Sequence, residues 1–459
     1  MGTNTEKYEG YSSLKHISII FLVGISGILV MILGTNIDIF CLPNYNRIFA
    51  ISNEDLFFTY SVIFTIINIF LLKFAKNLKL SFSKTRTILF VIIMINQLLI
   101  SAVLFMIYGQ IKLMSAYYNV LFYTIIYASL TASAACLTIA GFQFLRWFRR
   151  RKNNLVMLYG LVMLVLSANS IIGIIYLSEI SPSHYFIIKY SSCYSMFGSL
   201  HYTNPNLINM LKIAYDVTSF FSFILAWLAT VTMLKGYSKH KNKIAYWAVV
   251  SLPLIFFLSR YEVGLYYFLN NEAANILSSI NLSSNIYGYR TFENILNSNL
   301  QLGGALFGIA FLTLALKITG RGLQRNALIL TGIGIMFLFA SKDISTLVIS
   351  SYPPLGAVSI AFTGLASFLI YLGINSAATL TARDNNLRRD LRKKIENNLN
   401  LLKSISSSQH TIEIERNVKQ LMNLSAKWQE DNQQQDMTQE EIRTIVKDVI
   451  SELKTKKRP

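Results

Sequence analysis

Charged side chains are scarce in this chain of 459 residues. They make up 14% of the sequence, whereas soluble domains carry about 25%, and 53% of the residues are hydrophobic. This balance predicts a membrane protein and argues against a soluble one. Cysteine is equally rare: three in the whole chain exclude a disulfide-rich scaffold, and no Cys-x-x-Cys or Cys/His spacing typical of zinc occurs.

Catalytic motifs are absent as well. The sequence contains no Gly-rich nucleotide fingerprint, no P-loop, no HExxH zinc motif and no GxSxG nucleophile elbow. His410 precedes a helical stretch, as a phosphoacceptor would, but no ATP-binding domain accompanies it. We therefore predict an ordinary histidine in a turn between two helices. We also predict that the chain is not an enzyme and uses neither a cofactor nor a metal.

Long apolar segments fill the first 380 residues. A helix that spans a bilayer needs about 20 mostly apolar residues. We predict an all-α polytopic membrane domain over residues 1–380, with about ten transmembrane helices. The ten segments are, roughly, residues 17–33, 56–72, 87–108, 120–145, 155–177, 213–234, 244–262, 300–316, 327–350 and 355–379.

The basic residues predict how these spans are oriented. With the amino terminus in the cytoplasm, the inner loops hold 17 Lys or Arg and no acidic residue, while the outer loops and span ends hold seven basic and nine acidic residues. Basic residues resist translocation, so both termini are expected to be cytoplasmic. The net charge of +19 then reflects topology rather than nucleic-acid binding. The inner loops are residues 73–86, 146–152, 235–243 and 317–325.

Residues 381–459 are predicted to form a cytoplasmic helical tail. Leucine and isoleucine recur every three or four residues over 387–402, which predicts a helix that follows directly on the last span. The segment SISSSQH at 404–410 predicts a break, after which helices are expected over 412–428 and 438–453. We expect this tail to bind a cytoplasmic protein or to self-associate.

A basic cluster lies just beyond the last span. Its position predicts that it anchors the tail to anionic lipid headgroups at the inner surface of the plasma membrane. A cytoplasmic partner would then compete with lipid for this helix. The cluster consists of Arg388, Arg389, Arg392, Lys393 and Lys394.

Ionisable side chains near the outer ends of three spans suggest a ligand site. Asp216 lies about one turn below the outer end of the sixth span, and Arg260 and Glu262 close the seventh. Lys342 and Asp343 interrupt the ninth. One interpretation is a polar ligand pocket open to the outside. The other is structural pairing between helices, with long side chains reaching the interface.

Two cysteines fall in predicted outer loops. Cys41 and Cys193 would meet oxidising conditions there, which permit a disulfide between them. Cys136 lies within the fourth span and is predicted to be a small core residue.

Uncharged polar and small residues recur within the spans. Asn96–Gln97, Ser133 and Asn169–Ser170 are expected to hydrogen-bond between helices, and a polar translocation path is the alternative. Gly304 and Gly308 form a GxxxG motif. It predicts close packing inside the subunit, with homodimerisation as the alternative.

The end of the last span carries a family resemblance. The stretches PPLGAVSIAFTGLASFLIYLGINSAA and ARDNNLRRDLRKKIENNLNLLKSISSSQ, within residues 351–409, resemble multi-span membrane proteins of ammonia-oxidising archaea. The resemblance implies an archaeal plasma-membrane protein. It brings no assigned activity and no functional residue.

Two functions fit these features. The first is a membrane sensor or scaffold, in which the outer face meets a ligand and the tail passes its state to a cytoplasmic partner. The direct connection between the last span and the tail favours it. The second is a secondary transporter, because ten spans can be divided into two inverted sets of five.

Overall fold

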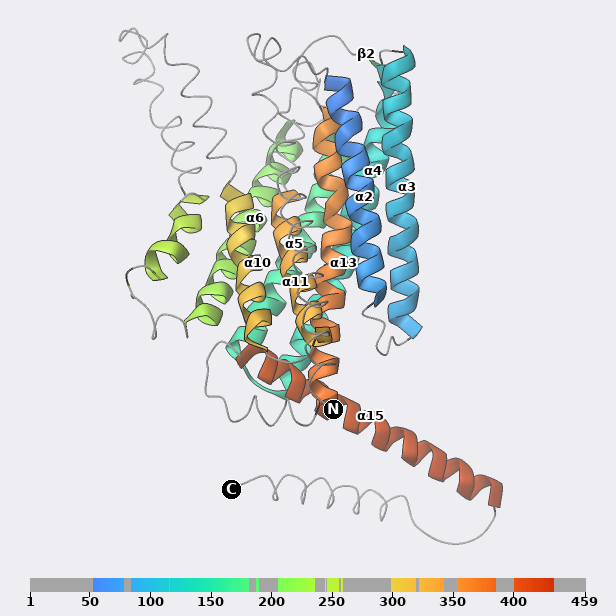
Figure 1. Ribbon diagram of the computed structural model, residues 1–459, viewed down its shortest axis with the longest axis vertical. Coiled ribbons are helices and arrows are strands. Elements are labelled where there is room, and N and C mark those ends of the chain that lie inside the picture. The colour runs from blue at the N-terminus through green and yellow to red at the C-terminus, as the bar shows by residue number, and fades with distance from the viewer. Residues whose placement is uncertain are drawn as a thin grey trace, which may run out of the picture.

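The computed structural model describes the helices and strands of this chain together with some of the residues next to them. Within this part of the chain, seven helices are long and apolar enough to cross a membrane, so the chain is an integral membrane protein. They run side by side as a bundle (Figure 1). The described residues are 53–77, 84–114, 116–180, 187–189, 205–235, 244, 246–255, 257–258, 299–318, 322–341, 353–384 and 400–432.

Seven of the ten predicted spans are confirmed as long helices. Each has an apolar 18-residue window with few charges, so the hydrophobic requirement that predicted these spans is met. These helices are α2 (Asn53–Asn77), α3 (Lys84–Met114), α4 (Asn119–Arg150), α5 (Asn154–Ile180), α6 (Pro205–Leu234), α11 (Gly322–Ser341) and α13 (Pro353–Arg383).

Two further predicted spans coincide with shorter apolar helices. The predicted span at 300–316 corresponds to α10 (Asn299–Lys317), whose apolar part covers Gly303–Leu316. Tyr246–Ile255 is helical within the predicted span at 244–262. The first predicted span, 17–33, lies outside the described residues.

A two-stranded sheet lies at one end of the bundle, which we call the strand end. β1 (Ala116–Tyr118) connects α3 to α4 and pairs antiparallel with β2 (Ile187–Lys189). Tyr117 is buried, and this burial raises the pKa of its hydroxyl, with Tyr123 adding to the rise. The loop predicted between the fifth and sixth spans thus contributes a strand.

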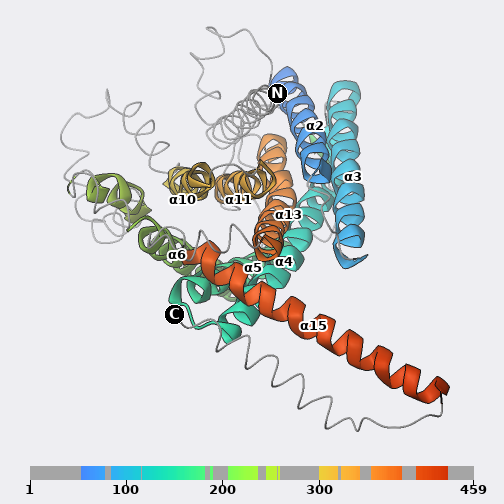
Figure 2. The ribbon, with the colours of Figure 1, turned by 60° about the horizontal axis from the view of Figure 1, so that its bottom comes forward.

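α13 occupies the centre of the bundle. It contacts α2, α3, α4, α11 and α15 (Asn400–Asn432), and every residue of its apolar window is buried (Figure 2). In α3 only 28% of the corresponding window is buried. Both helices are strongly hydrophobic, so the burial of α13 reflects its central place among other helices, while much of α3 is left for lipid. The small residues Ala357, Ala361 and Ala366 let its neighbours approach closely.

The GxxxG motif packs α10 against α11 within one molecule. A Cβ added at Gly308 would lie 2.5 Å from the carbonyl oxygen of Gly332, and one added at Gly304 would lie 2.6 Å from Cβ of Phe339. The predicted packing inside the subunit is therefore confirmed. α11 occupies the face that carries Gly304 and Gly308, so this face has no room for a second copy of the chain. The alternative prediction, homodimerisation through this motif, is therefore wrong.

Polar side chains connect helices in the fourth and fifth spans, as predicted. Ser133 and Ser367 join α4 to α13 through hydroxyl oxygens 2.7 Å apart, and the Asn169 amide donates to the Tyr215 carbonyl of α6 at 2.9 Å. In the third span the prediction finds no support. Gln97 is 1% exposed, and its amide atoms bond to no residue in the described part of the chain.

The tail prediction needs a correction at 404–410. α15 runs unbroken from Asn400 to Asn432, so no turn interrupts it and His410 lies within a helix. Serine disfavours helix interiors because its hydroxyl competes for backbone groups. Here Ser404, Ser406 and Ser408 are buried, and their small size lets α15 approach the bundle. Tertiary packing therefore overrides the local preference.

Candidate functional site at the α15 docking surface

α15 docks across the ends of α4, α5 and α13, opposite the strand end (Figures 1 and 2). Its first two turns supply an apolar face: Leu401, Leu402 and Ile405 are each at most 4% exposed and belong to the hydrophobic core. The helix is therefore continuous with the core of the membrane bundle at this end. Beyond these turns its side chains become exposed, as at Leu421.

Trp147 is the buried residue of α4 that hydrogen-bonds to α15. It is 1% exposed, and its indole N–H donates to Oε1 of Gln409 at 3.1 Å. Its backbone carbonyl accepts from the Ser408 hydroxyl at 3.1 Å and from the Arg151 amide that ends α4. α15 thus gives the buried indole N–H its acceptor and adds a second hydrogen bond to a carbonyl that the last turn of α4 already satisfies.

Charged side chains surround this buried contact. Arg150 donates to the Glu415 carboxylate, and Arg383 at the end of α13 lies 3.8 Å from Glu413. Arg151 donates to the Ser407 hydroxyl at 2.7 Å. The basic segment 146–152 that predicts membrane orientation therefore also forms part of the docking surface. The two ion pairs are solvent-exposed, so each contributes on the order of 1 kcal/mol or less.

An aromatic path leads from the docking surface into the bundle. Trp147 meets Phe144 edge-to-face at 5.3 Å, and Phe144 stacks on Tyr159 of α5 at 6.1 Å between ring centroids. Tyr159 then meets Phe311 of α10 at 5.4 Å. We call Trp147, Phe144, Tyr159 and Phe311 the aromatic path. The hydrogen bond between Trp147 and Gln409 connects α15 to one end of this path, and Phe311 of α10 is its other end.

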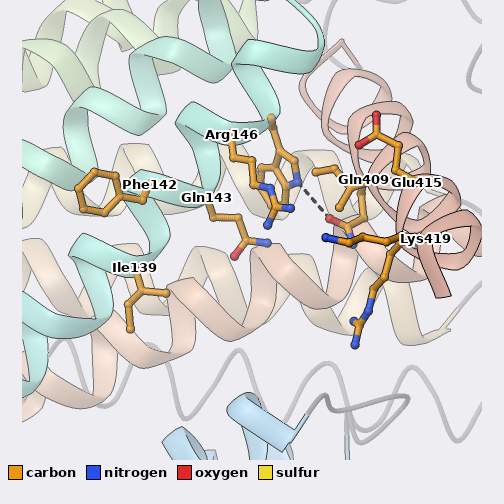
Figure 3. Close-up of a pocket in the computed structure, with 10 residues that line it drawn as sticks. Ile139, Phe142, Gln143, Arg146, Gln409, Glu415 and Lys419 are labelled. Atoms are coloured by element: carbon orange, nitrogen blue, oxygen red, sulfur yellow. Dashed lines mark hydrogen bonds between the residues drawn. The ribbon is translucent and has the colours of Figure 1, made fainter. Parts of the chain in front are cut away.

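A groove of about 700 Å³ lies between α4 and α15. Its α4 wall begins with apolar Ile139 and Phe142 and ends with Gln143 and Arg146. Figure 3 shows the polar ends of Gln143, Arg146 and Lys419 pointing into the space between the two helices. The α15 wall carries Gln409, Ile412, Glu415, Arg416 and Lys419, and Trp147 of α4 also lines the groove.

The predicted outer ligand pocket cannot be assembled from the described residues. Asp216 lies on α6, partly buried, next to the Asn169 bond to Tyr215. Arg260, Glu262, Lys342 and Asp343 lie outside the described residues, so the pocket stays a prediction.

Two other predicted sites also lie outside the described part of the chain. They are the possible disulfide between Cys41 and Cys193 and the anchoring cluster of Arg388, Arg389, Arg392, Lys393 and Lys394. Cys136, the third cysteine, is buried with a free thiol in α4, as a core residue would be.

The sequence interpretation missed the groove and the docking surface. Two signals pointed to them. The spacing of Ile139, Phe142 and Arg146 places them on one face of a helix. Glu413 and Glu415 are acidic residues of the tail, and their charge is opposite to that of the basic inner segment 146–152. Assigning the basic loop to topology alone left its binding role unconsidered.

Comparison of this chain with protein-family models, curated proteins and solved structures found no match. The function must therefore be argued from the site itself.

Proposed function

We propose that this protein is a plasma-membrane sensor or scaffold in which α15 reports the arrangement of the membrane helices to the cytoplasm. The observation that supports it is the docking of α15 on the ends of α4 and α13 through a small buried face and exposed ion pairs. α15 breaks its exposed ion pairs at little cost, but its release also uncovers the buried first turns, and a movement of the membrane helices must offset that cost. Its exposed remainder is then available to a cytoplasmic partner or to a second copy of the tail.

The aromatic path supplies a physical route for this coupling. Phe311 lies on α10, so a movement of α10 displaces Tyr159 and Phe144 and, through Trp147, the hydrogen bond to Gln409. Packed side chains of this kind carry coupling only if the element at their end has two arrangements that both sites bias. For this chain that element is α15, docked or released.

Hydrogen exchange of the full-length protein in lipid nanodiscs tests this coupling. We expect Phe311→Ala to raise amide exchange over residues 401–415 by about fivefold or more, the lower end of typical coupling effects. The control is Phe57→Ala, which removes an equally buried ring from α2 and does not lie on the aromatic path. Equal effects of the two variants, or no effect of Phe311→Ala, would contradict the proposal.

A chain that ends at Arg383 separates sensing from transport. A sensor loses its output when residues 384–459 are removed, although its membrane helices still fold. Uptake of a substrate that persists at the full rate in the truncated protein would instead favour the secondary transporter.

A further inference from the structure

The groove between α4 and α15 joins an apolar wall to a basic rim. Ile139 and Phe142 are 43% and 61% exposed, and in a membrane bundle such side chains face acyl chains. One turn further along α4 lies Arg146, beyond the apolar stretch and at the level where α15 crosses. The groove therefore changes from apolar to cationic along the direction in which a lipid changes from tail to headgroup.

The charge of the rim is predominantly positive. Arg146, Arg416 and Lys419 line it, and none of them forms an ion pair with another described residue. The one carboxylate in the lining, Glu415, already accepts from Arg150. Three cations from two helices line this groove, and together they suit an anionic phosphate group, because guanidinium and ammonium groups donate to its oxygens.

We propose that this groove binds an anionic phospholipid, whose headgroup contacts Arg146, Arg416 and Lys419 while an acyl chain lies along Ile139 and Phe142. A lipid bound in this way connects α4 to α15 and holds α15 against the membrane surface. The proposal does not depend on α15 acting as a reporter, because a lipid in this groove would equally hold a purely structural tail. The two proposals therefore have separate tests.

Native mass spectrometry of the full-length protein, with phosphatidylglycerol or phosphatidylcholine of identical acyl chains, tests the headgroup preference. We expect phosphatidylglycerol to remain bound and phosphatidylcholine to dissociate. The double variant Arg416→Gln with Lys419→Gln should weaken phosphatidylglycerol binding about 25-fold, since each cation near a membrane surface contributes about fivefold. Equal retention of the two lipids would overturn the proposal.

A matched control removes two charges outside the groove. Arg149→Gln with Lys152→Gln changes the net charge equally at the same end of α4, and neither residue lines the groove. This variant should bind phosphatidylglycerol like the unmodified protein. If it loses as much affinity as the groove variant, the attraction is general surface charge and the groove is not the site.

A third measurement separates a lipid from a free phosphate group. Phe142→Ala should weaken phosphatidylglycerol binding severalfold, and millimolar inorganic phosphate should not displace the lipid. Displacement by phosphate, with no effect of Phe142→Ala, would overturn the acyl-chain half of the proposal. In detergent without added lipid, unchanged amide exchange over residues 401–415 shows that the substitutions themselves leave α15 folded and docked.

Discussion

At Gly308 the backbone of a neighbouring helix leaves no room for a side chain. A methyl group there would meet the Met336 side chain, which can move, and the Gly332 carbonyl at 2.5 Å, which moves only with α11. We expect Gly308→Ala to lower the free energy of unfolding by about 1–3 kcal/mol, the usual cost of overpacking. Unfolding of the detergent-solubilised protein in a denaturant series measures it.

Gly109→Ala is the matched control. Gly109 lies within α3, and a Cβ added there meets no atom within 4 Å. Alanine at this position should be neutral or stabilise the helix by about 0.5–1 kcal/mol, because glycine loses more backbone entropy on folding. If both substitutions destabilise the protein to the same extent, close packing of α10 on α11 is not what the GxxxG motif provides.

At the scale of single residues, the sequence predicted types of contact better than partners. The GxxxG spacing predicted a close approach, yet Gly332, Met336 and Phe339 as the surface it meets follow only from the fold. Asn169 was expected to bond between helices, and its partner on α6 is likewise a product of the packing. Spacing along a chain reveals which face is special and not what lies against it.

At the scale of elements, α15 is held by two kinds of contact with different strengths. Leu402 and Ile405 are buried, so Leu402→Ala with Ile405→Ala should destabilise docking by about 2–5 kcal/mol for each residue. Glu413→Gln with Glu415→Gln removes the two exposed ion pairs and weakens the bond that the Gln409 amide donates to Glu413 at 3.2 Å, and should cost less than about 1 kcal/mol for each residue.

Amide exchange over residues 400–415 measures both variants. Faster exchange should be large for the apolar pair and small for the acidic pair, and raised salt should reproduce only the second effect. A larger effect from the acidic pair would mean that the ion pairs stabilise the docking of α15 more than the buried apolar residues do.

The prediction of elements succeeded where the signal was long and failed where it was local. Seven spans each rest on an apolar stretch of 18 residues or more, a requirement set by the bilayer and little affected by neighbours. The break at 404–410 rested on three local serines in a row, and burial against α4 and α13 outweighed their intrinsic preference. The individual contacts of the docked tail could not be predicted because its partners lie about 260 residues away in sequence, although the opposite charges of the two segments were visible.

At the scale of the whole molecule, the charge distribution predicts the orientation of the bundle in the membrane, and the docking of α15 specifies which end is concerned. Positive loops stay on the cytoplasmic side, so the end of the bundle that carries Arg150, Arg383 and α15 should face the cytoplasm, and the strand end should face outward. The carboxy-terminal ends of α4 and α13 lie at the same end of the bundle, next to α15, as this orientation requires (Figure 1).

Cysteine labelling in whole cells tests this orientation. In a chain with its three cysteines replaced by alanine, Tyr118→Cys at the strand end should react with a membrane-impermeant maleimide in intact cells. Leu421→Cys on the exposed part of α15 should react only after permeabilisation. Both parent side chains are exposed, at 42% and 65%, so a difference between the two reports sidedness rather than burial. The reverse pattern would place α15 outside, where it could serve no cytoplasmic partner, and both the charge argument and the proposed sensor would fail together.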